Sequence, residues 1–295
     1  MSEQTIAGVE EFSVAIPDGL TLRGRIYGPE NAADTVVCLA GLTRNGRDFH
    51  QLADILCGDP VKPWRVVTID SRGRGLSDRD PDKGRYTIPV EANDILAVCD
   101  SLGIERAGFI GTSRGGLLLH LIAGLRPALP AGVILNDIGP VIEPEGLRQI
   151  QAYLGRKRPQ PRDWAEAVAA VRADHGAAFP VLSDGDWRDM ARALYRETEE
   201  GIVADYDRAI ADQLAAADLS KPIPDLWPQF ESFRSIPLMV IRGEHSRLLS
   251  EATVSEMARR HPDLHRVTAP GQGHAPIPHI GDLPATIADF LRTCI

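Results

Sequence analysis

The feature that most restricts the fold is a series of short, continuous apolar runs separated by helical patterns. Continuous runs are typical of strands buried on both faces, because a strand with one solvated face alternates apolar and polar residues. Strands that alternate with helices predict an α/β protein with a mostly parallel sheet and right-handed crossovers. The clearest runs in the first half of the chain are 35–39, 65–69, 107–110 and 132–135, and the helical patterns between them are 49–57, 92–102 and 114–125.

The strand–helix rhythm is preceded by a hairpin and interrupted once. Residues 11–16 and 21–27 alternate apolar and polar positions around Pro17-Asp18-Gly19, which predicts two antiparallel strands. Between residues 138 and 233 there are helical patterns without a convincing buried strand. We therefore expect one sheet domain built from residues 1–137 and 234–295, with an all-helical insert at 138–233. After the insert the rhythm resumes with strands at 237–241 and 264–268 and helices at 251–260 and 284–292.

Composition excludes several classes of protein. The chain has 295 residues and a formal charge of -9, so it lacks the basic footprint that a general nucleic-acid partner requires. No apolar run approaches the roughly 18 residues of a membrane helix. The N-terminus has no secretory signal pattern, and the four cysteines have no CxxC spacing that would indicate a zinc site or a disulfide scaffold. We expect a cytoplasmic protein without metal or organic cofactor.

A GxSxG motif carries the chemistry. Gly111-Thr112-Ser113-Arg114-Gly115 follows a predicted strand and opens a predicted helix. A strand-to-helix turn this sharp strains the backbone at the serine and lifts its hydroxyl above the sheet edge, where the helix N-terminus favours developing negative charge. This context predicts that Ser113 is a nucleophile, whereas the alternative is a loop serine that caps the helix.

A serine hydroxyl needs a base within hydrogen-bond reach. His274 lies in the loop Gly271-Gln272-Gly273-His274, just after the last predicted strand, where a glycine-bounded loop can place an imidazole over the sheet edge. His279, five residues later, is the nearest rival. We therefore predict that His274 is the general base.

A tetrahedral intermediate needs donors directed at its oxyanion. One donor is expected from the backbone amide of Arg114, which directly follows the nucleophile. The second is expected from the loop after the early strand, and we assign it to the amide of Leu42, with Gly41 leaving room for the turn.

These motifs together resemble those of the α/β-hydrolases, in the cap-containing group of serine esterases. The resemblance spans essentially the whole chain and includes Asp70-Ser71-Arg72-Gly73-Arg74-Gly75-Leu76-Ser77-Asp78, which is similar to the D-x-R-G-x-G-x-S-D turn after the fourth strand. It implies a mostly parallel eight-stranded sheet with helices on both faces and a helical cap between strands 6 and 7. The oxyanion loop, which often reads His-Gly in the family, reads Ala40-Gly41 here.

The sequence constrains the third triad member, the carboxylate that orients the histidine, less than it constrains the other two. Many relatives carry an aspartate in the loop after the seventh strand, but this loop reads Gly243-Glu244-His245-Ser246-Arg247. A second location in the fold is the end of the sixth strand, where this chain has Asp137. We favour Asp137 as the acid that orients His274 and keep Glu244, the carboxylate of the late loop, as the alternative.

The predicted function is hydrolysis of carboxylic esters of small apolar substrates through an acyl-enzyme intermediate. A C–C bond hydrolase of the diketone type or a lactonase would use nearly the same groups, and acyl transfer to an acceptor other than water also stays open. A non-catalytic binding protein with this fold would keep the pocket and lose triad members, so Ser113 and His274 argue against it.

Overall fold

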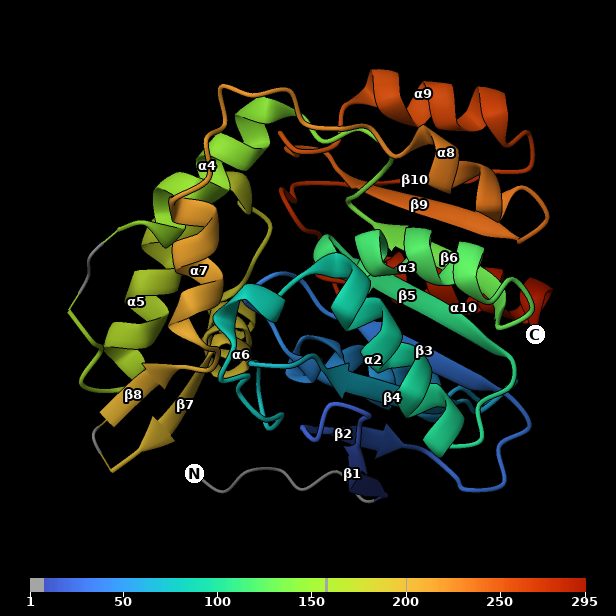
Figure 1. Cartoon of the computed structure of the whole chain (residues 1–295), viewed down its shortest axis with the longest axis horizontal. Helices are drawn as coiled ribbons and strands as arrows, with labels where there is room; N and C mark the ends of the chain where they lie inside the picture. Colours follow the sequence, from blue (N-terminus) through green and yellow to red (C-terminus); the bar gives the residue numbers. More distant parts are fainter. Residues whose placement is uncertain (1–7, 157–158, 200) are drawn as a thin grey trace.

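Eight strands form one sheet in the order β1-β2-β4-β3-β5-β6-β9-β10 (Figure 1). The computed structural model of the protein describes residues 8–156, 159–199 and 201–295. β1 pairs antiparallel with β2, β2 pairs antiparallel with β4, and all later neighbours are parallel. The strands are β1 (Val9–Ala15), β2 (Thr21–Tyr27), β3 (Thr35–Leu39), β4 (Arg65–Asp70), β5 (Ala107–Thr112), β6 (Pro130–Asn136), β9 (Leu238–Gly243) and β10 (His265–Ala269).

Helices cover both faces of this sheet (Figure 1). One hydrophobic cluster joins the sheet to α2 (Ile88–Ser101), α3 (Arg114–Leu125) and α9 (Glu251–Arg260). A second cluster joins the opposite face to α1 (His50–Cys57) and α10 (Leu283–Cys294). Burial on both faces is the physical reason that the central strands read as continuous apolar runs. The predicted hydrolase-type α/β architecture is therefore confirmed.

Element boundaries differ from the sequence prediction mainly at α2. The pattern placed its start at residue 92, but the helix begins at Ile88. Pro89 lies in the first turn, where its missing amide hydrogen costs no helical bond and its fixed φ favours the helix. The hairpin is confirmed in β1 and β2, whose register pairs Ala15 with Thr21 across the turn.

Helix α8 (Trp227–Phe230), at the end of the segment between β6 and β9, packs against α3, whereas the rest of the segment lies beside the large sheet, on the left of Figure 1. It has its own hydrophobic cluster, which includes Val171, Trp187 and Ile202. The expectation that it contains helices alone is wrong, because β7 and β8 form a two-stranded antiparallel sheet. Each strand has only four residues, too few to give a clear period in the sequence. The elements are α4 (Pro144–Leu154), α5 (Trp164–His175), α6 (Asp184–Leu194), β7 (Tyr195–Thr198), β8 (Gly201–Ala204), α7 (Arg208–Ala215) and α8 (Trp227–Phe230).

Helix length bears on membrane association. A bilayer-spanning helix needs about 20 predominantly apolar residues. Within the described ranges, no helix combines the length and the hydropathy needed to cross a membrane.

Candidate active site

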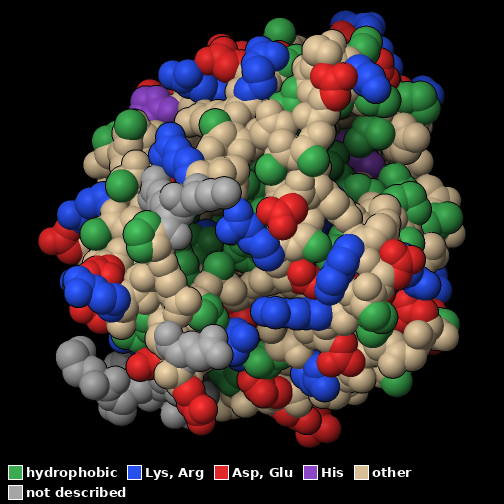
Figure 2. All heavy atoms as spheres, turned by 60° about the vertical axis from the view of Figure 1, so that its left-hand side comes forward, with side chains coloured by type: hydrophobic (Ala, Val, Ile, Leu, Met, Phe, Trp, Pro, Cys, Tyr) green, Lys and Arg blue, Asp and Glu red, His purple; other side chains and the backbone are tan. Residues whose placement is uncertain are grey.

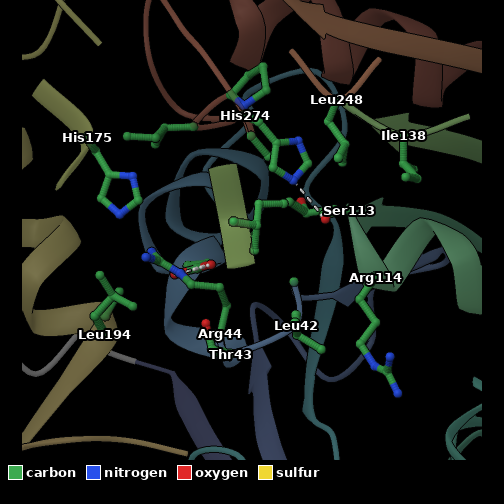
Figure 3. A pocket seen from close by; sticks show the side chains of 18 of the residues that line it. Leu42, Thr43, Arg44, Ser113, Arg114, Ile138, His175, Leu194, Leu248 and His274 are labelled. Carbon is green, nitrogen blue, oxygen red and sulfur yellow. Dashed lines mark hydrogen bonds and ion pairs between the residues drawn. The ribbon is translucent and has the colours of Figure 1, made fainter. Parts of the chain in front are cut away.

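Ser113 occupies a strained turn between β5 and α3. Its backbone has φ 51° and ψ −111°, a region that side-chain-bearing residues rarely adopt. The turn is possible because two glycines flank it. A Cβ at Gly111 would lie 2.6 Å from a methyl of Leu119, and a Cβ at Gly115 would lie 2.1 Å from the carbonyl oxygen of Leu39. The two glycines therefore allow β5 and α3 to pack closely at this turn, and the Ser113 side chain lines a cavity (Figure 3).

The three residues predicted as a triad lie in one hydrogen-bonded chain. His274 Nε2 is 2.9 Å from Ser113 Oγ, and His274 Nδ1 is 2.8 Å from Asp137 Oδ2. Figure 3 shows the first of these contacts as a dashed line at the edge of the cavity. A neutral imidazole that donates from Nδ1 to the carboxylate presents Nε2 as an acceptor. The arrangement can therefore remove a proton from the serine hydroxyl.

Asp137 is held by groups that the sequence did not suggest. Its carboxylate is fully buried, and besides His274 it accepts hydrogen bonds from the Gly243 amide at 2.9 Å and from Ser246 Oγ at 2.6 Å. Its backbone also has a positive φ of 55°. Ser246 lies in the late loop, in the region where the family resemblance leads one to expect an aspartate. The loop thus supplies a hydroxyl donor to a carboxylate that comes from the neighbouring strand.

Glu244, the alternative acid, lies elsewhere in the same loop. Its side chain is exposed, and its Oε2 accepts the backbone amide of Gly271 at 2.7 Å. Glu244 therefore contacts the beginning of the histidine loop, whereas the imidazole of His274 donates to Asp137.

The two residues expected to supply oxyanion donors line the same cavity as Ser113 (Figure 3). Arg114 is the first residue of α3, so its amide has no carbonyl partner within its own helix. The loop that contains Leu42 passes close to Ser113, since a Cβ at Gly41 would lie 3.9 Å from Ser113 Cβ. Both backbones thus lie near the Ser113 hydroxyl.

The cavity has a volume of about 410 Å³ and a largely apolar wall. Its wall comes from both the sheet loops and the segment 138–233. On the face shown in Figure 2, cationic and anionic side chains are intermixed, and hydrophobic side chains are visible in a hollow between them. The apolar lining residues include Leu117, Ile138, Ile142, Leu147, Ile150, Met190, Leu194, Ile210, Leu214 and Leu248.

Ionisable groups in the cavity wall are mostly neutral or paired. Burial raises the pKa of Tyr153 to about 12, so its hydroxyl stays protonated. Burial lowers the pKa of His279, which favours its neutral form. Arg44 is paired with Asp48 through an Nε–Oδ2 contact of 2.7 Å. In the part of the chain that the structure describes, no group of three or more His, Cys, Asp and Glu side chains is arranged to hold a metal ion.

Comparisons with known proteins agree with this architecture. The profile of the α/β hydrolase fold matches residues 34–278. A 3-hydroxybutyrate-oligomer hydrolase of Cupriavidus necator is 33% identical over 249 residues, which cover 82% of each chain. A 2-(acetamidomethylene)succinate hydrolase of Mesorhizobium japonicum is 29% identical over 235 residues, or 79% of each chain. The crystal structure of an α/β hydrolase from Novosphingobium aromaticivorans superposes with a TM-score of 0.88 at 38% identity, covering 97% of this chain and 99% of that one. The protein belongs to the α/β hydrolase fold family.

Proposed function

We propose that this hydrolase is a serine carboxylesterase that cleaves esters of small apolar substrates through an acyl-enzyme intermediate, with residues 138–233 acting as its cap. The observation that carries the proposal is the continuous hydrogen-bonded chain from Ser113 through His274 to Asp137. A nucleophile, a base and an orienting acid in this order are the parts that acyl transfer requires.

The first half-reaction forms the acyl-enzyme. Ser113 Oγ attacks the ester carbonyl while His274 Nε2 takes the hydroxyl proton, and the resulting imidazolium is stabilised by the Asp137 carboxylate. The amides of Leu42 and Arg114 hold the oxyanion, each supplying roughly 3 kcal/mol, and the base supplies about 10²–10⁴-fold in rate. His274 then passes its proton to the departing alcohol oxygen as the C–O bond breaks.

The second half-reaction returns the free enzyme. Water enters in place of the alcohol, His274 takes one of its protons, and the hydroxide oxygen attacks the acyl carbon. Collapse of the second tetrahedral intermediate releases the carboxylic acid, and the imidazolium returns its proton to Ser113 Oγ. The nucleophile, base and acid are therefore regenerated without another reactant.

The cavity supports small, mostly apolar esters as substrates. Its volume of about 410 Å³ is within the range of small-molecule sites, and its wall is largely aliphatic. The relative from Cupriavidus necator is named for hydrolysis of 3-hydroxybutyrate oligomers, which are short linear esters. Dimers and trimers of 3-hydroxybutyrate are therefore the first natural esters that we propose as substrates.

The test compares wild type with Ser113→Ala. Wild type is expected to hydrolyse p-nitrophenyl acetate and butanoate and 3-hydroxybutyrate dimers, and to be labelled by a fluorophosphonate probe. Ser113→Ala should lose both activity and labelling. Ser101→Ala, an exposed serine at the end of α2, serves as the control and should retain both. Unchanged turnover in Ser113→Ala would refute the proposal.

A further inference from the structure

A buried carboxylate joins two arginines behind the nucleophile. Glu91, on α2, is 1% exposed. Its Oε1 accepts Nη1 of Arg74 at 2.8 Å and Nη2 of Arg114 at 2.8 Å, and its Oε2 accepts Nε of Arg114 at 2.8 Å. One carboxylate thus receives three charge-assisted hydrogen bonds, which are stronger and more directional than neutral ones. We call Arg74, Glu91 and Arg114 the buried bridge.

One end of the buried bridge holds the loop after β3. Arg74 Nε donates to the carbonyl oxygen of Leu42 at 2.9 Å, and Arg74 itself is 1% exposed. The carbonyl and the amide of one residue are linked through only two soft dihedral angles. Fixing the carbonyl of Leu42 therefore restricts the direction in which its amide can point.

The other end of the buried bridge holds the start of α3. The guanidinium of Arg114 donates to Glu91 through both Nε and Nη2, and Nη2 also donates to the Tyr86 carbonyl at 3.1 Å. Its backbone amide follows Ser113 directly. The bridge thus connects the two separate pieces of backbone that supply the proposed oxyanion donors.

The charges of the buried bridge do not cancel. Burial by itself would raise the pKa of Glu91, but the attraction of Arg74 and Arg114 outweighs burial and lowers that pKa, so the carboxylate is ionised. Two guanidinium groups against one carboxylate leave one positive charge. The carboxylate therefore offsets the mutual repulsion of the two guanidinium groups and holds Arg74 and Arg114 in place.

We propose that Glu91 is a positioning residue for hydrolysis, which through Arg74 and Arg114 holds the amides of Leu42 and Arg114 at the spacing that a tetrahedral oxyanion requires. This inference rests on the serine hydrolase function proposed above. An interaction that is stronger in the transition state than with bound substrate affects kcat more than KM. Loss of Glu91 should therefore act on turnover and on binding of tetrahedral analogues.

The test uses Glu91→Gln with Asp94→Asn as its matched control. Asp94 lies three residues further on α2, is also buried, and binds Arg72 through two contacts of 2.6 Å. Among the described residues, its side chain has no hydrogen bond to the oxyanion loop or to Arg114. Both variants remove one buried negative charge from the same helix. Steady-state ester kinetics and the Ki of an aliphatic trifluoromethyl ketone, which forms a tetrahedral adduct with the serine, are measured for each, with thermal unfolding alongside.

For Glu91→Gln we expect kcat to fall about 10- to 100-fold, with KM within about 3-fold of wild type. The trifluoromethyl ketone should lose affinity by the same factor as kcat. Asp94→Asn should lower the melting temperature and leave kcat and Ki unchanged. Wild-type kcat and Ki in Glu91→Gln, or equal losses in both variants, would overturn the inference.

Two further variants separate folding and function from positioning. If Glu91→Gln does not fold, Arg114→Gln removes one arm at a side chain that is 15% exposed, and it should show the same parallel loss of kcat and ketone affinity. Unchanged kcat and Ki in Arg114→Gln would also overturn the inference.

Ser113→Ala reports on the proposed function alone. An active Ser113→Ala refutes serine hydrolysis, whereas an inactive Ser113→Ala with a fully active Glu91→Gln refutes only the positioning role.

Discussion

Ser246 Oγ lies 2.6 Å from Asp137 Oδ2, so a hydroxyl from the loop after β9 donates to a carboxylate at the end of β6. The two strands are parallel neighbours, and adjacent strands are about 4.8 Å apart. A carboxylate on either strand end is therefore within reach of the same imidazole. In this chain the carboxylate bonded to the imidazole directly follows β6, and its hydroxyl donor lies in the loop after β9.

Replacing the acid should separate the two candidate carboxylates. Asp137→Asn is expected to lower kcat by about 10³–10⁴-fold, because an amide neither holds the correct imidazole tautomer nor stabilises the imidazolium. Glu244→Gln, which alters only an exposed bond to the Gly271 amide, should retain kcat within about 2-fold. Steady-state ester hydrolysis measures both. The reverse result would assign the acid to Glu244.

Removing the supporting hydroxyl should produce a smaller effect. Ser246→Ala deletes the hydrogen bond to the Asp137 carboxylate, an interaction of about 1.5–3 kcal/mol, while Asp137 keeps its bonds to His274 and Gly243. It also removes the acceptor of the Leu248 and Leu249 amides within the loop. We expect kcat to fall by about 10-fold. Ser250→Ala, which removes the N-cap of α9, is the control and should lower thermal stability without changing kcat. Equal kcat values for the two variants would contradict a role for Ser246.

Filling the cavity should shift the chain-length preference. Ile150 lies on α4 and lines the cavity, so Ile150→Trp should reduce the space for long substrates. We expect kcat/KM for p-nitrophenyl octanoate to fall at least about 10-fold more than for the acetate, since overpacking costs roughly 1–3 kcal/mol. Leu125→Trp, at an exposed position of α3, should change neither value. A uniform loss for all chain lengths would place Ile150 outside the acyl or alcohol site.

Acid should destabilise the fold through His120. This buried histidine donates from Nδ1 to the Gly116 carbonyl over 2.8 Å and packs against Phe233, and burial lowers its pKa to about 4. The unfolded chain, with a histidine pKa near 6.5, binds more protons between pH 6.5 and pH 4, so stability falls as the pH falls through this window. Between pH 7 and pH 5, the contribution of His120 to the free energy of unfolding falls by about 2 kcal/mol.

The measurement is thermal unfolding of wild type and His120→Leu at pH 7 and pH 5. The drop in melting temperature between the two pH values should be about 4 °C smaller in the variant. Part of the acid sensitivity should persist, because burial also lowers the pKa of His50 and of His279. An identical drop in both proteins would show that His120 is not the group responsible.

The convergence of Ser113, Asp137 and His274 could be predicted because parallel strands end at a common edge. Ser113 and Asp137 directly follow buried strands that the apolar runs locate. His274 lies in the loop after β10, an edge strand that is mostly exposed. Sequence order and sheet topology therefore suffice to gather the three side chains, although the catalytic roles stay predictions until variants are measured.

The partners of these residues could not be predicted in the same way. Glu91 is one acid among several on α2, and its burial against Arg74 and Arg114 depends on how the helix packs on the sheet loops. Ser246 contacts Asp137 across 109 residues of sequence. Such contacts leave no periodic pattern in the sequence. The strands β7 and β8, with four residues each, are too short to leave one either.

Asp137, the proposed acid, is the last residue before the segment 138–233, so it lies at the junction between the sheet and the insert. Its amide is bonded to the Ile241 carbonyl at 2.7 Å, which fixes the carboxylate in register with β9. An engineer who transplants a foreign lid must therefore splice downstream of this position.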